Sequence, residues 1–215
     1  MSTASAPSRA QRFRLDGVSW RAYEGLLRAF EDERHLRVTY DRGSLEIMTL
    51  SPRHERPKHL LGQLVVMLAL ELDMNIAGYG SMTMKRRLEK RGLESDECYW
   101  IENEAKVRNL KKFDLRRDPP PDLVLEIDVT HSSLNRLAIY AALRVPEVWR
   151  WDEEKLEVYV LNAQGEYEIQ HQSLAFPSFR PAELARFLKM GNTIGETQML
   201  RVFREWIRER KKTRR

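Results

Sequence analysis

The sequence predicts a mixed α/β (α+β) fold, in which a core of one helix, three strands, a second helix and a fourth strand is flanked by β-hairpins. Two observations lead to this prediction. Segments with helical spacing and segments with strand composition follow one another in that order. The chain also has no internal repeat, and no linker long enough to separate two domains. We therefore expect one domain over residues 15–208, between a disordered basic arm (1–14) and a basic tail (209–215).

The composition is that of a globular protein with an uneven distribution of charge. Of the 215 residues, 42% are hydrophobic and 32% are charged, which allows a sizeable core and is too much charge for a membrane protein. The formal net charge is +5, but residues 201–215 alone hold eight basic and two acidic side chains. Residues 15–200 contain 26 bases and 30 acids. The net charge therefore does not by itself predict a nucleic-acid-binding domain.

Cysteine content and hydropathy predict a cytoplasmic location. The single cysteine, Cys98, excludes an intramolecular disulfide and fits a reducing compartment. The longest apolar run, LVVMLAL at 64–70, is far shorter than the roughly 20 residues that span a bilayer. The N-terminal residues lack the apolar centre of a secretory signal. We expect no membrane segment.

The first elements are a helix and a hairpin. Apolar residues recur at helical spacing over 19–31, and this spacing predicts a helix. The following segment has strand composition on both sides of Asp41-Arg42-Gly43. Glycine at such a position suits the positive φ of a tight turn, so we expect a hairpin there.

A longer helix is expected over 52–72. Ser51 and Pro52 are typical of an N-cap and a first helical position. Leucines and valines form one stripe of this helix, and His54 and Lys58 extend the stripe toward its N-terminus. Glu55 lies beside that stripe. The helix could deliver these polar side chains to a site at a sheet edge, or its first turn could simply protrude into water.

The rest of the chain completes the core. Strand composition and turn residues alternate after residue 75, and the proline-rich segment 103–121 is expected to connect two of the strands. The remaining expected elements are strands at 76–87, 96–102 and 122–130, a helix from Ser132 or Ser133 to Leu143, a strand at 147–152, a hairpin around 162–165 and a C-terminal helical region.

Acidic residues mark the third core strand. In PPPDLVLEIDVTHSSL, the side chains of Asp122, Glu126 and Asp128 fall on one face, because side chains alternate along a strand. Like charges about 7 Å apart on one face are unfavourable unless cations, donors or water compensate them. Such a face is either exposed to solvent or part of a functional site.

Two further acids favour a functional site over an exposed face. Asp96 opens the preceding strand, and Glu55 lies in the first turn of the long helix. Carboxylates from separate elements that meet at a sheet edge form the oxygen-rich sites that hold Mg²⁺ or Mn²⁺. Such an ion can polarise a phosphodiester and activate a water molecule.

Three segments carry a resemblance to a known family: SPRHERPKHLLGQL, SDECYWIENEAKV and DPPPDLVLEIDVTHSSLNRLAIYAALRVPEVWRWD. The chain resembles the Uma-two family of endonucleases, a branch of the PD-(D/E)XK restriction-endonuclease-like superfamily, from about residue 15 to 208. The resemblance implies a restriction-endonuclease-like core. It also implies a metal-dependent endonuclease that hydrolyses DNA, and a homodimer in which two sites cut two strands.

The resemblance also implies the site residues. Glu55, Asp96 and Glu126 would bind Mg²⁺ or Mn²⁺, with Asp122 and Asp128 as additional acids. The superfamily usually has a lysine two residues after the third-strand acid, where this chain has Asp128.

Two other cations could replace that lysine. Arg136 on the following helix could stabilise developing charge, although arginine cannot act as a base. Lys85 on the first core strand is the other candidate. Without either replacement, the chain would be a nuclease-like fold without catalysis, acting as a nucleic-acid-binding or dimeric interaction module.

The basic C-terminus, REWIRERKKTRR, allows two interpretations. Basic residues at the end of a helix complement its dipole. They could instead anchor nucleic-acid phosphates without regard to sequence.

Overall fold

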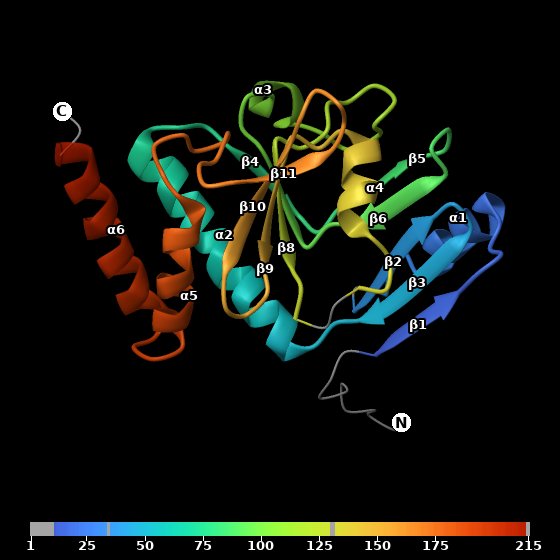
Figure 1. Ribbon diagram of the computed structural model, residues 1–215, viewed down its shortest axis with the longest axis horizontal. Helices are drawn as coiled ribbons and strands as arrows, with labels where there is room; N and C mark the ends of the chain where they lie inside the picture. Colours follow the sequence, from blue (N-terminus) through green and yellow to red (C-terminus); the bar gives the residue numbers. More distant parts are fainter. Residues whose placement is uncertain (1–10, 34, 130–131, 214–215) are drawn as a thin grey trace.

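Two β-sheets stand side by side in the computed structural model of the chain, which describes residues 11–33, 35–129 and 132–213 (Figure 1). Helix α2 packs on one face of the second sheet, and α5 and α6 pack against α2. The predicted mixed α/β architecture is confirmed.

The first sheet has the order β1-β3-β2-β6-β5, with β1 at Arg12–Leu15, β2 at Leu36–Asp41, β3 at Ser44–Thr49, β5 at Thr83–Arg86 and β6 at Arg91–Glu94. The second has the order β11-β10-β9-β8-β7-β4, with β4 at Ala77–Gly80, β7 at Glu97–Trp100, β8 at Leu123–Ile127, β9 at Glu147–Trp151, β10 at Leu156–Leu161 and β11 at Tyr167–Gln170.

The predicted first helix and hairpin are confirmed. Helix α1 spans Trp20–Ala29, and the Ser19 side chain caps it by accepting a hydrogen bond from the Ala22 backbone N–H at 3.2 Å. Strands β2 and β3 meet at a turn in which Arg42 and Gly43 both have positive φ, 48° and 105°. Glycine tolerates this conformation at no steric cost, so the turn is as the sequence indicated.

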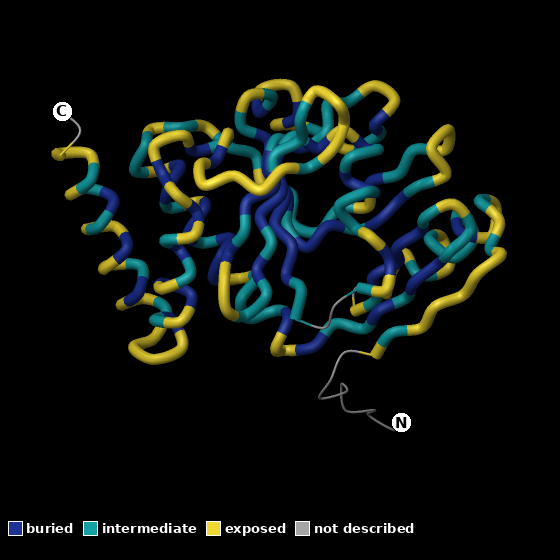
Figure 2. The backbone as a smooth tube through the Cα atoms, viewed as in Figure 1, coloured by how far each residue is buried: buried dark blue, intermediate teal, exposed yellow. Residues whose placement is uncertain are grey.

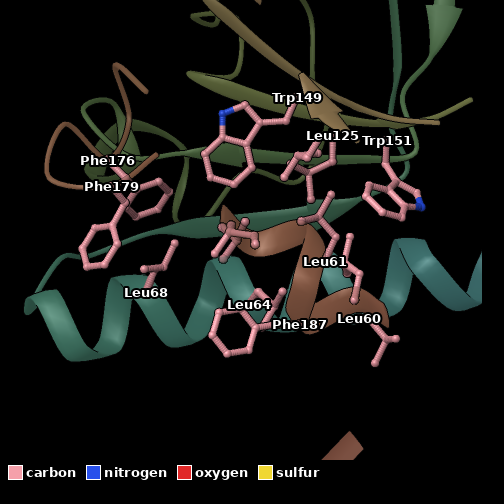
Figure 3. Packing of buried hydrophobic residues seen from close by; sticks show 14 of the residues in the cluster. Leu60, Leu61, Leu64, Leu68, Leu125, Trp149, Trp151, Phe176, Phe179 and Phe187 are labelled. Carbon is pink, nitrogen blue, oxygen red and sulfur yellow. The ribbon is translucent and has the colours of Figure 1, made fainter. Parts of the chain in front are cut away.

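Helix α2 spans Pro52–Leu72, the range predicted from its stripe and its Ser-Pro start. Its leucines, including Leu61 and Leu64, point toward Trp149 of the second sheet and Phe187 of α5 (Figure 3). Strands β8 and β9, on which this layer rests, are buried along most of their length (Figure 2). Burial of this apolar surface fixes α2 on the sheet.

The prediction of one strand over 76–87 is wrong, because this segment forms two strands and each belongs to a different sheet. Strand β4 ends at Gly80 in the second sheet, and β5 begins at Thr83 in the first. The chain crosses back between β6 and β7, at Ser95 and Asp96. The two crossings are bonded together: the Ser95 N–H donates to the Met82 carbonyl at 3.1 Å, and the Ser81 hydroxyl donates to the Asp96 carbonyl at 3.1 Å.

The second half of the predicted core is confirmed. Strands β8 and β9 are parallel and are connected through α4 (Arg136–Leu143), whereas the other pairings of described strands are antiparallel. The expected strand at 122–130 is shorter, and Thr130 lies outside the described residues. The predicted start of the second core helix, at Ser132 or Ser133, is wrong, because α4 begins at Arg136. Asn135 caps it by accepting from the Ala138 N–H at 3.0 Å.

The chain ends differ from the expected arm and tail. Residues 12–14 of the arm belong to β1, which pairs with β3, while residues 1–10 lie outside the described residues. Residues 209–213 of the tail continue α6 (Glu196–Thr213), and residues 214–215 lie outside the description. The remaining elements are α3 at Glu104–Val107 within the expected connection, a 3₁₀ helix at Pro181–Leu184 and α5 at Ala185–Gly191.

No helix among the described residues combines the length and the apolar character that a membrane crossing requires.

Replacing Leu64 by alanine should lower the free energy of unfolding by about 2–5 kcal/mol, because the side chain is fully buried and a cavity would remain. Leu70 on the same helix is 68% exposed, so Leu70→Ala should change stability by less than about 0.5 kcal/mol. Urea titration of both variants measures the difference. Equal losses would contradict the packing of α2.

Candidate active site

A cavity of about 230 Å³ lies between the two sheets. Arg37, Thr39 and Glu46 of the β2–β3 hairpin line one wall. The other wall contains Glu126 at the end of β8 and Arg136 at the start of α4. Strand β8, which was predicted to carry functional acids, thus faces a cavity lined by polar residues.

Glu126 and Arg136 form a buried ion pair. The Arg136 Nε and Nη2 atoms donate to the Glu126 Oε2 and Oε1 atoms at 2.6 and 2.7 Å, and the Tyr140 hydroxyl also donates to Oε1. The same guanidinium donates to the Thr39 hydroxyl and the Glu94 carbonyl, both at 2.8 Å. Burial raises the pKa of the Glu126 carboxyl even though Arg136 faces it. One arginine therefore links β8 to two strands of the other sheet.

Asp96 is held by His54 in a second buried cluster. The Asp96 Oδ2 atom lies 3.1 Å from His54 Nε2 and accepts from the Ile127 N–H at 2.8 Å. His54 Nδ1 lies 3.1 Å from Glu55 Oε1. The imidazole ring therefore stands between the two carboxylates.

These contacts set the charge of His54. Burial alone would lower its pKa, but the hydrogen bonds with Asp96 and Glu55 outweigh burial and raise the pKa to about 9. The bond with His54 in turn lowers the pKa of Glu55 to about 2. At neutral pH His54 is an imidazolium that donates to two carboxylates, so it does not act as a base in this arrangement.

The other predicted site residues divide between the cavity and its surroundings. Asp128 lines the cavity together with Asp96 and Glu126. Lys85 instead forms an ion pair with Glu24 at 2.9 Å, outside the cavity.

Asp122 also lies outside the cavity. Its Oδ2 atom accepts from the backbone N–H groups of Ile101 and Asn103 at 2.6 and 3.2 Å. It thus closes a turn, although strand alternation placed it on the face of Glu126.

The donors in the cavity fit a hard cation in chemical type, because Mg²⁺ and Mn²⁺ prefer carboxylate oxygens. Among the described residues, however, no group of three or more His, Cys, Asp and Glu side chains is arranged to hold a metal ion. Glu126 is bonded to Arg136, and Asp96 to His54. Binding a cation at both acids requires these partners to release carboxylate oxygens.

The sequence prediction missed the hairpin wall of the cavity. Thr39 stands opposite Glu46, and Arg37 opposite Met48, so all four side chains share one face of the hairpin. Glu46 is buried and accepts from the hydroxyls of Ser132 and Ser133, both at 2.7 Å. The polar residues at alternate positions in LRVTY and SLEIMT are a signal that could have identified this face.

A core of helix, three strands, helix and strand, with acids beside the central strand, defines the restriction-endonuclease-like class of fold. Residues 20–190 match the family model Uma2, described as "Putative restriction endonuclease". The chain belongs to this family, which confirms the resemblance seen in the sequence. Comparison with curated proteins gave no match.

Arg136→Ala should lower the free energy of unfolding by about 3–5 kcal/mol, because it leaves Glu126 buried without its cation. Arg53→Ala provides the control, since Arg53 pairs with Glu153 on the surface and should contribute little. Guanidinium chloride titration compares the two. A loss at Arg53 as large as that at Arg136 would contradict the buried network.

The stability should also depend on the protonation of His54. Its pKa is about 9 in the folded chain and near 6.5 when unfolded, so the protonated form stabilises the fold. This contribution is complete below about pH 6.5 and disappears as the pH rises through 9. The free energy of unfolding of the wild type should fall over that window, and the fall should be smaller in His54→Gln. If the free energy of unfolding of the wild type and of His54→Gln fell equally over this window, His54 would not be charged in the folded protein.

Proposed function

We propose that the chain is an endonuclease that hydrolyses DNA phosphodiester bonds with Mg²⁺ or Mn²⁺ held by Asp96 and Glu126. The observation that carries this proposal is that two buried carboxylates, one directly before β7 and one on the neighbouring strand β8, line one cavity. The family description supports the endonuclease activity. When bound, the cation supplies positive charge at the phosphate and lowers the pKa of an attacking water.

The residues around the two acids have distinct roles in this proposal. Arg136 faces the cavity and stabilises negative charge that develops on the phosphate. Lys85 lies outside the cavity, so Arg136 is the better candidate for this role. His54 and Glu55 position Asp96 through the imidazole. Asp128 is an auxiliary acid on the same wall.

One observation favours a second candidate function. Both carboxylate oxygens of Glu126 accept hydrogen bonds from Arg136, and Oε1 also accepts one from Tyr140. A carboxylate so fully bonded suits a nuclease-like fold without catalysis, which binds nucleic acid or forms a dimeric interaction module. A homodimer belongs to the first candidate as well, since two sites would cut two strands.

Glu126→Gln and Asp96→Asn should each reduce cleavage of plasmid DNA at least about 100-fold, because each removes a charged ligand of the cation. Glu166→Gln is the matched control, since Glu166 is exposed between β10 and β11 and does not line the cavity. Circular dichroism checks that each variant is folded.

The cation dependence separates the two candidate functions. Cleavage by the wild type should stop with EDTA, and calorimetry should detect Mn²⁺ binding that Glu126→Gln loses. A folded wild-type chain that neither binds Mn²⁺ nor cuts DNA would favour the second candidate function, the nuclease-like fold without catalysis. Unchanged cleavage by Glu126→Gln would contradict the proposed role of this acid.

A further inference from the structure

A second hollow, of about 340 Å³, lies beside the β5–β6 hairpin, and we name it the basic pocket. It is bounded by the start of α1, by the hairpin and by the segment 112–116. These segments bring together two basic clusters that are separate in the sequence. Its basic lining residues are Lys85, Arg86, Arg87, Lys112 and Arg116.

The basic pocket has an excess of positive charge. Its two acids are Glu24 and Asp114, and they are already paired with Lys85 at 2.9 Å and Arg116 at 2.5 Å. The hydrogen bond from Lys85, together with the positive charge of Lys85 and Arg87, lowers the pKa of Glu24.

Two of the cations in the basic pocket are available to a ligand. Arg87 and Lys112 are exposed, and neither side chain has an ion-pair or hydrogen-bond partner among the residues that the structure describes. Exposed cations on separate segments around one hollow form a surface for a polyanion.

The basic pocket leads toward the candidate active site. A groove of about 800 Å³ shares Lys85 and Lys112 with it and extends to Glu55 and Lys58 at the start of α2. The groove also reaches Arg37, which lines the cavity of Asp96 and Glu126. A polymer held in the basic pocket can therefore follow this groove as far as Arg37, at the wall of that cavity.

The basic C-terminal helix uses several of its cations in ion pairs within the protein. It lies at the opposite end of the molecule from the β5–β6 hairpin (Figure 1). Arg204 and Arg208 both bond to Glu71 of α2, and Arg210 pairs with Glu183. These cations fasten α6 to the body of the protein.

We propose that the basic pocket binds the phosphodiester backbone of the DNA substrate through Arg87 and Lys112, and that the groove leads the strand from there to Asp96 and Glu126. This inference rests on the proposed function, because it takes the same DNA as its ligand. It places the phosphate contacts on the body of the protein and not on the basic ends of the chain.

The test is DNA binding in EDTA, where no cleavage occurs. Fluorescence anisotropy is measured with a labelled duplex and with one of its single strands, from 50 to 200 mM salt. The double variant Arg87→Ala/Lys112→Ala removes two phosphate contacts, so Kd should rise about tenfold or more. The slope of log K against log salt should become shallower by about 2. Arg201→Ala/Lys212→Ala, with the same change of charge on α6, should bind as the wild type does.

The outcomes separate the basic pocket from the nuclease activity. Weaker binding of either DNA form by the first double variant alone supports the basic pocket. Equal affinity and salt slope in that variant, equal losses in the two double variants, or a wild type that binds neither DNA form would overturn it. Glu126→Gln should still bind in EDTA without cutting in Mg²⁺. If the wild type binds through Arg87 and Lys112 but never cuts, only the nuclease proposal fails.

Discussion

The buried ion pair between Arg136 and Glu126 is the interaction on which the arrangement of the two sheets depends. A buried guanidinium must satisfy its donors within the protein, because an unpaired buried charge is very unfavourable. Arg136 does so with acceptors from β8, β2 and β6, which belong to both sheets. The position of α4, the width of the cavity and the environment of Glu126 are therefore set together.

The same principle explains how several acids share one region of the interior. Each buried carboxylate beside the cavity faces a cation or a set of donors: Glu126 faces Arg136, Asp96 faces His54, and Glu46 accepts bonds from Arg12 and two serines. Acids that lie close together here are tolerated because other elements of the fold supply cations and hydrogen-bond donors to them. In a nuclease that uses this site, a metal ion would have to replace some of these hydrogen bonds and ion pairs at the carboxylates.

Local patterns predicted the elements well, and long-range contacts explain what they missed. The bounds of α2 follow from a cap, a proline and one apolar stripe, all of which are local. The split of the 76–87 strand is not visible in composition, because both halves suit a strand and only their partners differ.

The prediction of site residues from local patterns has the same limit. Asp96, Glu126 and Asp128 were predicted and line one cavity. Asp122 shares their alternation but turns to the N–H groups of another loop, and Glu46 lies 86 residues from the serine that bonds to it. The two chain crossings at Ser81–Met82 and Ser95–Asp96 place Asp96 where the chain passes from one sheet to the other. Its carbonyl accepts from the Ser81 hydroxyl and its carboxylate from the Ile127 N–H of β8, so the position of Asp96 depends on how the two sheets meet and not on either sheet alone.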